Sequence, residues 1–317
     1  MSNYDPFDPG WHQLLSNTSG LVLEYVVYRS NRGSTADARR NFIMAQCPGW
    51  GITSEYLQHG LSEFWAPCST SANHMEKPTS YTVVFFHPRG TGESLRPVVA
   101  PKMSSMDMAG DIEDLRKYLA VEQFPVLLGH ANGGAIALNY AEMYPDRVQK
   151  LILIAHQIIG MQDRQTDMLA ATRDNPAYRG AWDRVPIRRP QTDEELTDTV
   201  NTIWPLYFYD PEKYTDEILR AIGDQQMSAW TYRWQTHCDQ NVEDQDQMAD
   251  GLKFVRAKTL VIHGQDDMII GSKIARRTME IPGAELITYK ECGHFPWIEK
   301  KADTMRDIRR FIEGGKR

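Results

Sequence analysis

Short runs of hydrophobic residues recur along the chain, each bounded by glycine, proline or polar residues. The interior runs at 83–86 and 151–154 are apolar at every position instead of alternating with polar residues. Such continuous apolarity is typical of parallel strands whose two faces are both covered. The pattern predicts strands at residues 21–28, 41–47, 81–87, 125–128, 150–155, 259–263 and 285–289.

Helical patterns lie between these strands. Spacings of four, three and four residues place one apolar stripe on a helix that contains Met108, Ile112, Leu115 and Leu119. Residues 135–144 and 302–312 predict two further helices. Alternation of strands and helices predicts an α/β protein with a mostly parallel, doubly wound sheet covered by helices.

One stretch, residues 157–250, contains no strand pattern but many aromatic residues. We expect it to form a helical cap (lid) on a core made of residues 1–156 and 251–317. Its aromatic side chains either line a substrate site or only fill the interior of the cap. The candidates for substrate contact in the cap are Trp182, Trp204, Tyr207, Trp230 and Trp234.

Composition narrows the class of protein. Hydrophobic residues make up 41% and charged residues 24% of the 317 residues, as in globular proteins, which excludes disordered and fibrous classes. No apolar run is long enough to span a membrane, and residues 1–12 lack the pattern of a secretory signal. The net charge of −7 disfavours nucleic-acid binding. Because cysteines and histidines lack metal-ligand spacing, we expect reduced thiols, no metal, no cofactor and a cytoplasmic protein.

The most informative segment reads GHANGG at residues 129–134, where a predicted strand runs directly into a helix. It resembles the nucleophile elbow of the α/β-hydrolase superfamily, Gly-x-Ser-x-Gly, with Ala131 at the position where serine is expected. The nucleophile of such an elbow occupies a strained turn, so glycines must flank it to let neighbouring backbone pass closely.

Two further segments follow in the order that this family requires, which is nucleophile, acid and histidine. The family pattern selects Asp267 as the acid after the strand at 259–263, with Asp266 as the alternative. His294 follows the next strand within the sequence CGHFP. The resemblance implies that Asp267 orients His294, which acts as general base and then as general acid.

The resemblance also implies an oxyanion hole made of backbone N–H groups. Asn132, directly after the nucleophile position, would donate one of them, and Trp50 in the loop CPGWG would donate the other. Gly49 in this loop, and His156 at the end of the strand before the cap, are further candidates for substrate contact.

A turn with the sequence HPRGTGES at residues 87–94 is similar to the family's Asp-x-Arg-Gly-x-Gly-x-Ser turn, with His87 at the acidic position. We expect this turn to brace the elbow. Together the four motifs resemble the capped branch of the superfamily that contains proline iminopeptidases and epoxide hydrolases. The elbow lacks the Gly-Gly-Ser-Trp-Gly sequence of true proline iminopeptidases, which disfavours peptide cleavage.

Alanine at position 131 leaves three interpretations open. In the first, it replaces the serine of an esterase or lactonase, and the chain is an inactive variant that still binds substrate. In the second, His294 and Asp267 together act as a general base in an enzyme that needs no cofactor, as the resemblance to cofactor-free dioxygenases and lyases implies. In the third, the chain is a non-catalytic receptor for a small molecule. The sequence favours the first, because every other catalytic element is present.

The aromatic cap predicts a bulky apolar or aromatic ester or lactone as substrate, for example a polyketide lactone. The partners expected are this small molecule and neither a nucleic acid nor a membrane. A homodimer is compatible with the sequence.

Overall fold

The computed structural model describes residues 4–29, 35–66, 80–98, 102–163, 165–185 and 189–315. An eight-stranded sheet in the order β1-β2-β4-β3-β5-β6-β7-β8 runs through the described part of the chain. β2 pairs antiparallel with both β1 and β4, and the other neighbours pair in parallel. The strands are β1 (Gly10–Leu15), β2 (Val22–Tyr28), β3 (Phe42–Gln46), β4 (Thr82–Phe86), β5 (Val126–His130), β6 (Lys150–Ile154), β7 (Lys258–Gly264) and β8 (Glu285–Tyr289).

The predicted doubly wound sheet is confirmed, and the seven predicted strands correspond to β2–β8. The edge strand β1 was missed because its residue types do not follow its burial. Trp11 and Leu15 are apolar but exposed, whereas the polar His12 is buried beside Leu14. Hydrophobic alternation therefore could not reveal this strand.

Alternate residues of each central strand enter two separate hydrophobic cores, one on each face of the sheet. In β4, Val83 and Phe85 face one core, whereas Val84 and Phe86 face the other. This is why the central strands are apolar at every position. The helices outside the cap are α1 (Thr35–Arg40), α2 (Glu55–Leu61), η1 (Ser62–Phe64), α3 (Ser105–Tyr118), α4 (Ala131–Met143), α11 (Ser272–Thr278), α12 (Pro296–Glu299) and α13 (Lys301–Glu313).

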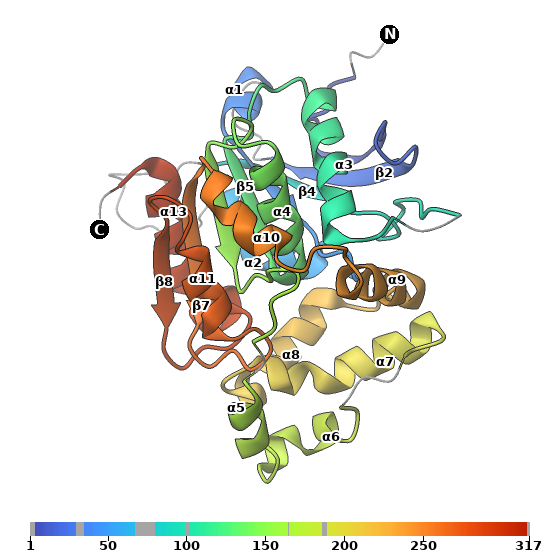
Figure 1. Ribbon diagram of the computed structural model, residues 1–317, viewed down its shortest axis with the longest axis vertical. Coiled ribbons are helices and arrows are strands. Elements are labelled where there is room, and N and C mark those ends of the chain that lie inside the picture. The colour runs from blue at the N-terminus through green and yellow to red at the C-terminus, as the bar shows by residue number, and fades with distance from the viewer. Residues whose placement is uncertain are drawn as a thin grey trace.

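The described residues between β6 and β7 form helices and no strand, as expected for a cap. These elements are α5 (Thr166–Ala171), η2 (Pro176–Tyr178), α6 (Arg179–Trp182), α7 (Asp193–Ile203), η3 (Trp204–Tyr207), α8 (Pro211–Ile222), α9 (Ala229–Gln240), α10 (Gln247–Gly251) and η4 (Leu252–Phe254). Figure 1 shows α5–α9 together at the end of the sheet toward which β7 and β8 point. These helices, called the cap below, therefore lie over the carboxyl ends of the parallel strands.

The last helix of the expected cap packs against the core instead. Met248 of α10 is fully buried in the hydrophobic core that contains α4. Figure 1 shows α10 in front of α4, above the other cap helices. Helices α10 and α4 approach each other closely, because a Cβ atom on Gly251 would lie 2.7 Å from the carboxyl carbon of Glu142. The packing therefore joins α10 to the core, although the sequence placed it in the cap.

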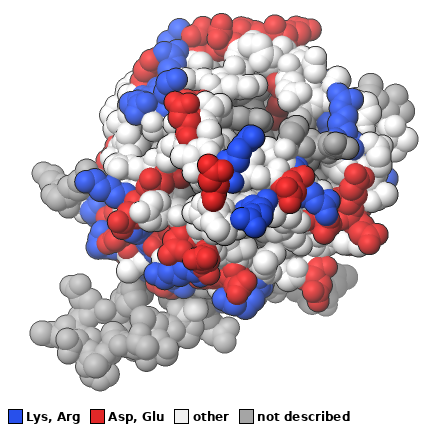
Figure 2. Space-filling view, turned by 90° about the horizontal axis from the view of Figure 1, so that it is seen from below, with Lys and Arg blue, Asp and Glu red and all other residues white. Residues whose placement is uncertain are grey.

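Charged residues of both signs are interspersed on the face of the molecule seen in Figure 2. No helix within the described residues has the length and apolarity that a membrane span requires.

The tightest contact between sheet and helix lies at Gly133, near the start of α4. A Cβ atom there would lie 2.3 Å from the carbonyl oxygen of Gln46 at the end of β3. Because the neighbour is backbone, it cannot rotate away. Helix α4 can approach the sheet at this distance only if residue 133 is glycine.

We predict that Gly133→Ala lowers the free energy of unfolding by about 1–3 kcal/mol, because β3 and α4 must separate. Chemical denaturation measures the change. Gly180→Ala is the matched control, since no atom lies within 4 Å of a Cβ atom at this position in α6. The control should leave stability unchanged or raise it by up to about 1 kcal/mol. Equal losses in both variants would contradict the steric explanation.

Candidate active site

Ala131 stands at the turn from β5 into α4 with a φ of +50°. This left-handed conformation is unfavourable for a residue with a Cβ atom, by about 1–2 kcal/mol. The glycines at 129 and 133 lie where the neighbouring backbone passes closely, since added Cβ atoms would come within 2.5 Å and 2.3 Å of carbonyl oxygens. The turn therefore has the strained geometry expected of a nucleophile elbow, with a methyl group in the nucleophile's place.

His294 and Asp267 form a hydrogen-bonded pair at the edge where the parallel strands end. Nδ1 of His294 donates to Oδ2 of Asp267 at 2.7 Å, and both side chains are buried. The backbone N–H groups of Ile269 and Ile270 donate to Oδ1 of Asp267 at 2.9 and 3.0 Å. Burial alone would raise the pKa of Asp267, but His294 and these donors outweigh it and hold the pKa below its ordinary value.

Because Asp267 occupies Nδ1, the other ring nitrogen of His294 is left for a ligand. His294 lines a cavity together with Ala131. Nε2 has no hydrogen-bond partner among the described residues. The pair can therefore accept a proton from a group bound in the cavity, as a general base requires.

His130, the residue directly before Ala131, holds the loop of His294 in place. Its Nε2 atom and the carbonyl oxygen of His294 are 3.0 Å apart, and its Nδ1 atom lies 3.2 Å from the hydroxyl of Tyr56 on α2. Burial and the nearby His294 lower the pKa of His130 well below its ordinary value, so its ring is neutral. A neutral ring donates from Nε2 to the carbonyl and accepts from the tyrosine at Nδ1. The sequence reasoning missed both residues, although His130 lies inside the elbow motif.

The two backbone donors expected for an oxyanion hole flank the elbow. Trp50 and Asn132 both line the cavity. Neither backbone N–H has an acceptor among the described residues, whereas the N–H of Gly49 donates to Oδ1 of Asn132 at 3.0 Å. Gly49 thus connects the two sides of the expected hole, and Trp50 and Asn132 keep donors for a ligand.

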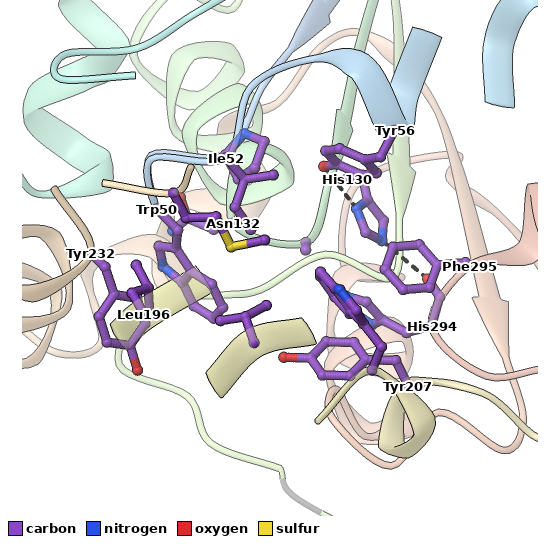
Figure 3. Close-up of a pocket in the computed structure, with 15 residues that line it drawn as sticks. Trp50, Ile52, Tyr56, His130, Asn132, Leu196, Tyr207, Tyr232, His294 and Phe295 are labelled. Atoms are coloured by element: carbon purple, nitrogen blue, oxygen red, sulfur yellow. Dashed lines mark hydrogen bonds between the residues drawn. The ribbon is translucent and has the colours of Figure 1, made fainter. Parts of the chain in front are cut away.

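The cavity beside the elbow encloses about 600 Å³, including its open mouth. Core and cap contribute to its wall, as Figure 3 shows for His130 and His294 on one side and for Leu196 and Tyr232 on the other. Its described lining residues are Pro48, Trp50, Ile52, Tyr56, His130, Ala131, Asn132, Leu196, Val200, Trp204, Tyr207, Met227, Tyr232, His294 and Phe295. No serine, threonine, cysteine or carboxylate is among them, so none of these side chains could act as a nucleophile from this lining.

Of the cap residues expected to contact substrate, Trp204 and Tyr207 line the cavity. Trp182, Trp230 and Trp234 do not belong to its described lining. Nε1 of Trp182 donates to Thr172 within the cap at 3.0 Å.

The other two tryptophans, both on α9, lie elsewhere, and Trp230 packs at the margin of the hydrophobic core that contains α4. Trp230 stacks under the guanidinium of Arg96, and the side chain of Trp234 is 36% exposed. The sequence showed that aromatic residues gather here but not which way each one faces.

His156 and Gly49 also lie outside the described lining of the cavity. His156 is buried behind the elbow, where Nε2 lies 2.7 Å from the hydroxyl of Thr278. Burial and the neighbouring His263 lower the pKa of His156 to about 3, so the ring stays neutral. Gly49 contributes its backbone to the polar contacts of Asn132 instead.

The turn that contains His87 connects three elements beneath the site. His87 is fully buried, with Nδ1 2.8 Å from a carboxylate oxygen of Glu24 on β2 and Nε2 2.8 Å from the hydroxyl of Ser54 before α2. Arg89 in the same turn forms a buried ion pair with Asp111 of α3 at 2.6 Å. These contacts agree with a structural role for the turn.

The cap is hydrogen-bonded directly to the loop that carries His294. The backbone N–H of His294 donates to the carbonyl oxygen of Tyr207 at 2.7 Å. The buried carboxyl group of Glu299 accepts from the backbone N–H groups of Gly293 at 2.6 Å and Tyr209 at 2.8 Å. Burial raises the pKa of Glu299 to about 7 against these donors.

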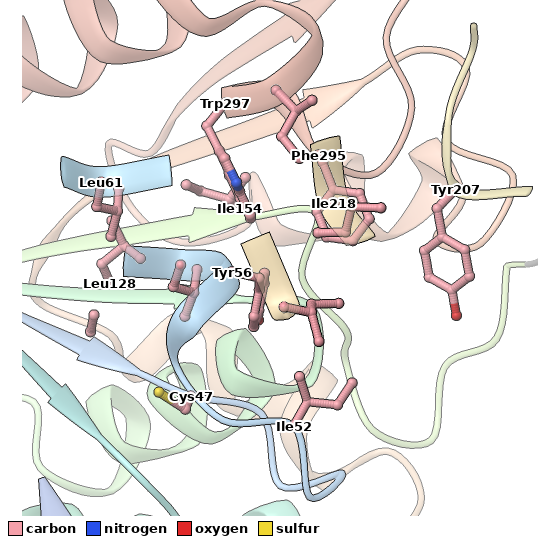
Figure 4. Close-up of a cluster of buried hydrophobic side chains, with 14 of the residues drawn as sticks. Cys47, Ile52, Tyr56, Leu61, Leu128, Ile154, Tyr207, Ile218, Phe295 and Trp297 are labelled. Atoms are coloured by element: carbon pink, nitrogen blue, oxygen red, sulfur yellow. The ribbon is translucent and has the colours of Figure 1, made fainter. Parts of the chain in front are cut away.

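Apolar contacts reinforce this junction. Figure 4 shows Phe295 of the histidine loop, Tyr56 of α2 and Ile218 of α8 in one cluster. The cluster therefore contains side chains from both the core and the cap.

The nearby cysteines do not replace the missing nucleophile. Cys292 is fully buried two residues before His294, and Cys47 is fully buried at the end of β3. Burial raises the pKa of both thiols, so neither ionises near neutral pH. Neither side chain lines the cavity within the part of the chain that the structure describes.

We predict that Asp267→Asn lowers the free energy of unfolding near neutral pH. The lowered pKa of Asp267 means that its ionised form stabilises the fold above the ordinary carboxyl pKa of about 4. This stabilisation is lost as the pH falls through the lowered value, so the difference between the two proteins should shrink in acid. Denaturation at a series of pH values measures it.

Asp266→Asn provides the matched control for this prediction. The half-buried carboxylate of Asp266 accepts a single bond, from the N–H of Cys292 at 3.3 Å. Its replacement should have a smaller effect. A loss for Asp267→Asn that is as large at pH 2 as at pH 7 would exclude the ionised pair as its source.

Comparisons with known proteins agree with this geometry. A family model described as alpha/beta hydrolase fold matches residues 56–301. A candidate carbamate hydrolase, RutD, from Caulobacter sp. (strain K31) is 32% identical over 283 residues, which cover 84% of this chain and 88% of the relative. A 2-hydroxy-6-oxo-2,4-heptadienoate hydrolase from Pseudomonas putida is 25% identical over 191 residues, which cover 59% of this chain and 62% of the relative. A proline iminopeptidase from Xylella fastidiosa is 24% identical over 163 residues, which cover 51% and 49%. The matches thus span less than two thirds of these last two relatives.

Solved structures share the architecture at low sequence identity. An esterase from Exiguobacterium antarcticum superposes with a TM-score of 0.66 at 18% identity, over 96% of this chain and all of the esterase. A meta-cleavage product hydrolase from Pseudomonas fluorescens IP01 gives a TM-score of 0.61 at 18% identity, over 96% of this chain and 97% of the hydrolase. With the strained elbow, the His294–Asp267 pair and the family match over most of its length, the chain belongs to the α/β-hydrolase fold family.

Proposed function

We propose that the site is built to hydrolyse an ester or lactone bond of a bulky apolar or aromatic small molecule. In this proposal a serine at position 131 would be the nucleophile, and Ala131 leaves the chain able to bind the substrate but unable to form an acyl-enzyme. The observation that supports this proposal most directly is the φ of +50° at Ala131, beside the His294–Asp267 pair. Strain of this kind persists at functional sites, because the turn aims one side chain at the bound substrate.

Each part of the site fits one step of such a reaction. A hydroxyl at position 131 would lose its proton to Nε2 of His294 as it attacks the carbonyl carbon. The N–H groups of Trp50 and Asn132 would stabilise the negative charge that develops on the carbonyl oxygen. His294 would then protonate the leaving alkoxide and activate the water that releases the acid.

The described lining of the cavity supports a neutral substrate. Aromatic and aliphatic side chains dominate it, and neither lysine nor arginine is among its members. The relative from Pseudomonas putida is a hydrolase of a heptadienoate, a substrate with a carboxylate. A buried carboxylate needs a cationic or strong hydrogen-bonding partner, which favours an uncharged aromatic ester or lactone here.

We predict that Ala131→Ser converts the chain into an esterase. Loss of the nucleophile from a comparable triad costs about 10⁶ in turnover, so the gain over the unchanged chain should reach several orders of magnitude. Aryl esters and aromatic macrolactones form the substrate panel. Mass spectrometry follows the products and looks for an acyl group on residue 131.

The matched control is Ala131→Gly, which relieves the positive φ but adds no hydroxyl. It should stay inactive, and adding His294→Ala to the serine variant should abolish the gained activity. If the serine variant hydrolyses only small acetyl esters, the proposed substrate class is wrong. If it hydrolyses nothing, while the alanine chain consumes oxygen with an aromatic substrate or only binds it tightly, the hydrolase proposal is wrong.

A further inference from the structure

A buried polar network surrounds the side chain of Asn132, directly behind the expected oxyanion hole. Its Oδ1 atom accepts from the N–H of Gly49 at 3.0 Å and from Nε2 of Gln235 at 2.7 Å. Its Nδ2 atom donates to Oγ of Ser105 at 3.0 Å. Ser105 in turn donates from Oγ to Oδ2 of Asp239 at 2.9 Å. Groups from α4, the loop before α2, the start of α3 and cap helix α9 therefore meet at one point.

The carboxylate of Asp239 sets the direction of the bonds that the Ser105 hydroxyl makes in this network. An ionised carboxylate only accepts, and it takes both the N–H and the O–H of Ser105, at 2.7 and 2.9 Å. The Oγ atom of Ser105 then has two lone pairs left. They accept from Nδ2 of Asn132 at 3.0 Å and from Nε2 of Gln235 at 3.2 Å.

This direction decides which end of the Asn132 amide faces the loop. With its nitrogen turned toward Ser105, the oxygen faces the N–H of Gly49. The reversed amide would place a donor against that N–H and leave both unsatisfied. The network thus joins the elbow, through Asn132, to the loop that carries Trp50.

The two cap residues of the network are one helical turn apart. Gln235 and Asp239 stand at positions i and i+4 of α9, on the face that meets the core. Gln235 is fully buried, and a Cβ atom on Gly49 would lie 2.5 Å from its Oε1 atom. The helix therefore packs directly on the backbone of the oxyanion loop.

We propose that Gln235 and Asp239 are positioning residues of the oxyanion hole, through which the cap fixes the Asn132 side chain and the Gly49 backbone. The inference deepens the proposed function and rests on it, because the oxyanion hole has a chemical use only if a carbonyl group reacts there. Neither residue touches the substrate cavity among its described lining residues.

The charge of Asp239 makes this positioning dependent on pH. The groups that face it are Ser105 and Asn132, with Asp107 of α3 as the nearby like charge, while Cys238 adjoins it on its own helix. Burial, with a smaller contribution from Asp107, raises the pKa of Asp239 to about 6 in spite of the Ser105 and Asn132 donors. Below this pH the carboxyl group carries a proton and becomes a hydrogen-bond donor. Ser105 can then no longer donate to both carboxyl oxygens, and its hydroxyl is no longer held in one direction.

The unmodified chain can test this directly. The amide signal of Gly49 is followed by NMR in protein labelled with ¹⁵N-glycine, between pH 4.5 and 8. We expect it to shift with a midpoint near pH 6. Asp239→Asn should abolish this titration, and Gln235→Leu should displace the signal at every pH. Glu243→Gln removes one negative charge, as Asp239→Asn does, but at an exposed position just beyond α9. It should leave the titration of the Gly49 signal as in the unmodified chain.

The Asp239→Asn variant separates the titration of Asp239 from that of the histidines near the site, because it leaves the histidines in place. A Gly49 titration that survives this variant, or a signal that Gln235→Leu does not move, would overturn the proposal. Thermal melting of each variant shows that it is folded before its spectrum is compared.

A kinetic test applies in the Ala131→Ser background. Gln235→Leu should lower kcat by about 10-fold to 100-fold, less than the loss of a whole oxyanion donor, with KM within about twofold. A change in KM alone would contradict a positioning role. If the serine variant is inactive but Gly49 titrates as expected, the hydrolase proposal fails and the positioning by the cap stands.

Discussion

The backbone turn at Ala131 is the constraint on which the site depends. To aim a side chain at the cavity from the end of β5, the chain must adopt φ +50° and then enter α4 at once. Helix α4 can do so only because Gly133 lets it lie against the carbonyl oxygen of Gln46. The same close approach brings the amide of Asn132 next to the loop after β3, which carries Trp50. One tight turn thus sets both the position of residue 131 and one of the two donors of the proposed oxyanion hole.

The cap covers the site and is also hydrogen-bonded to the residues that form it. It is hydrogen-bonded to the loop of His294 through the carbonyl oxygen of Tyr207 and, by way of Glu299, through the N–H of Tyr209. On the other side of the site, Gln235 donates to the side chain of Asn132. These contacts are buried hydrogen bonds, whose loss without replacement costs about 1–3 kcal/mol each. Movement of the whole cap away from the core would break them together.

The sequence predicted the central strands and the strand-to-helix turn at Ala131, and it singled out Asp267 and His294, which the fold brings together. Each of these predictions depends on local pattern. Apolar runs identify strands covered on both faces, and the motifs fix which residues follow them. The cavity wall could not be predicted in this way. Trp204 and Tyr207 face the site while Trp182, Trp230 and Trp234 do not, since helix rotation against the core decides this.

Two polar residues show the same limit. His156 bonds to Thr278, far along the chain, and Asn132 bonds to Gln235, 103 residues away. Such pairings arise only when distant segments pack together. They leave no periodic signal in the sequence, so their contacts could be found only in the folded chain.

Two costly features of the site are present although residue 131 is alanine. The positive φ of Ala131 destabilises the fold by about 1–2 kcal/mol, and the burial of Asp267 is tolerated only because His294 and two backbone donors compensate it. Neither feature is needed for a receptor that holds an apolar molecule by packing alone. Both fit the proposed reaction, in which His294 receives a proton. A ligand that presents a carbonyl group to Trp50 and Asn132 needs a hydroxyl at position 131 to complete that reaction. A ligand with an acidic proton of its own would need only the pair that is already there.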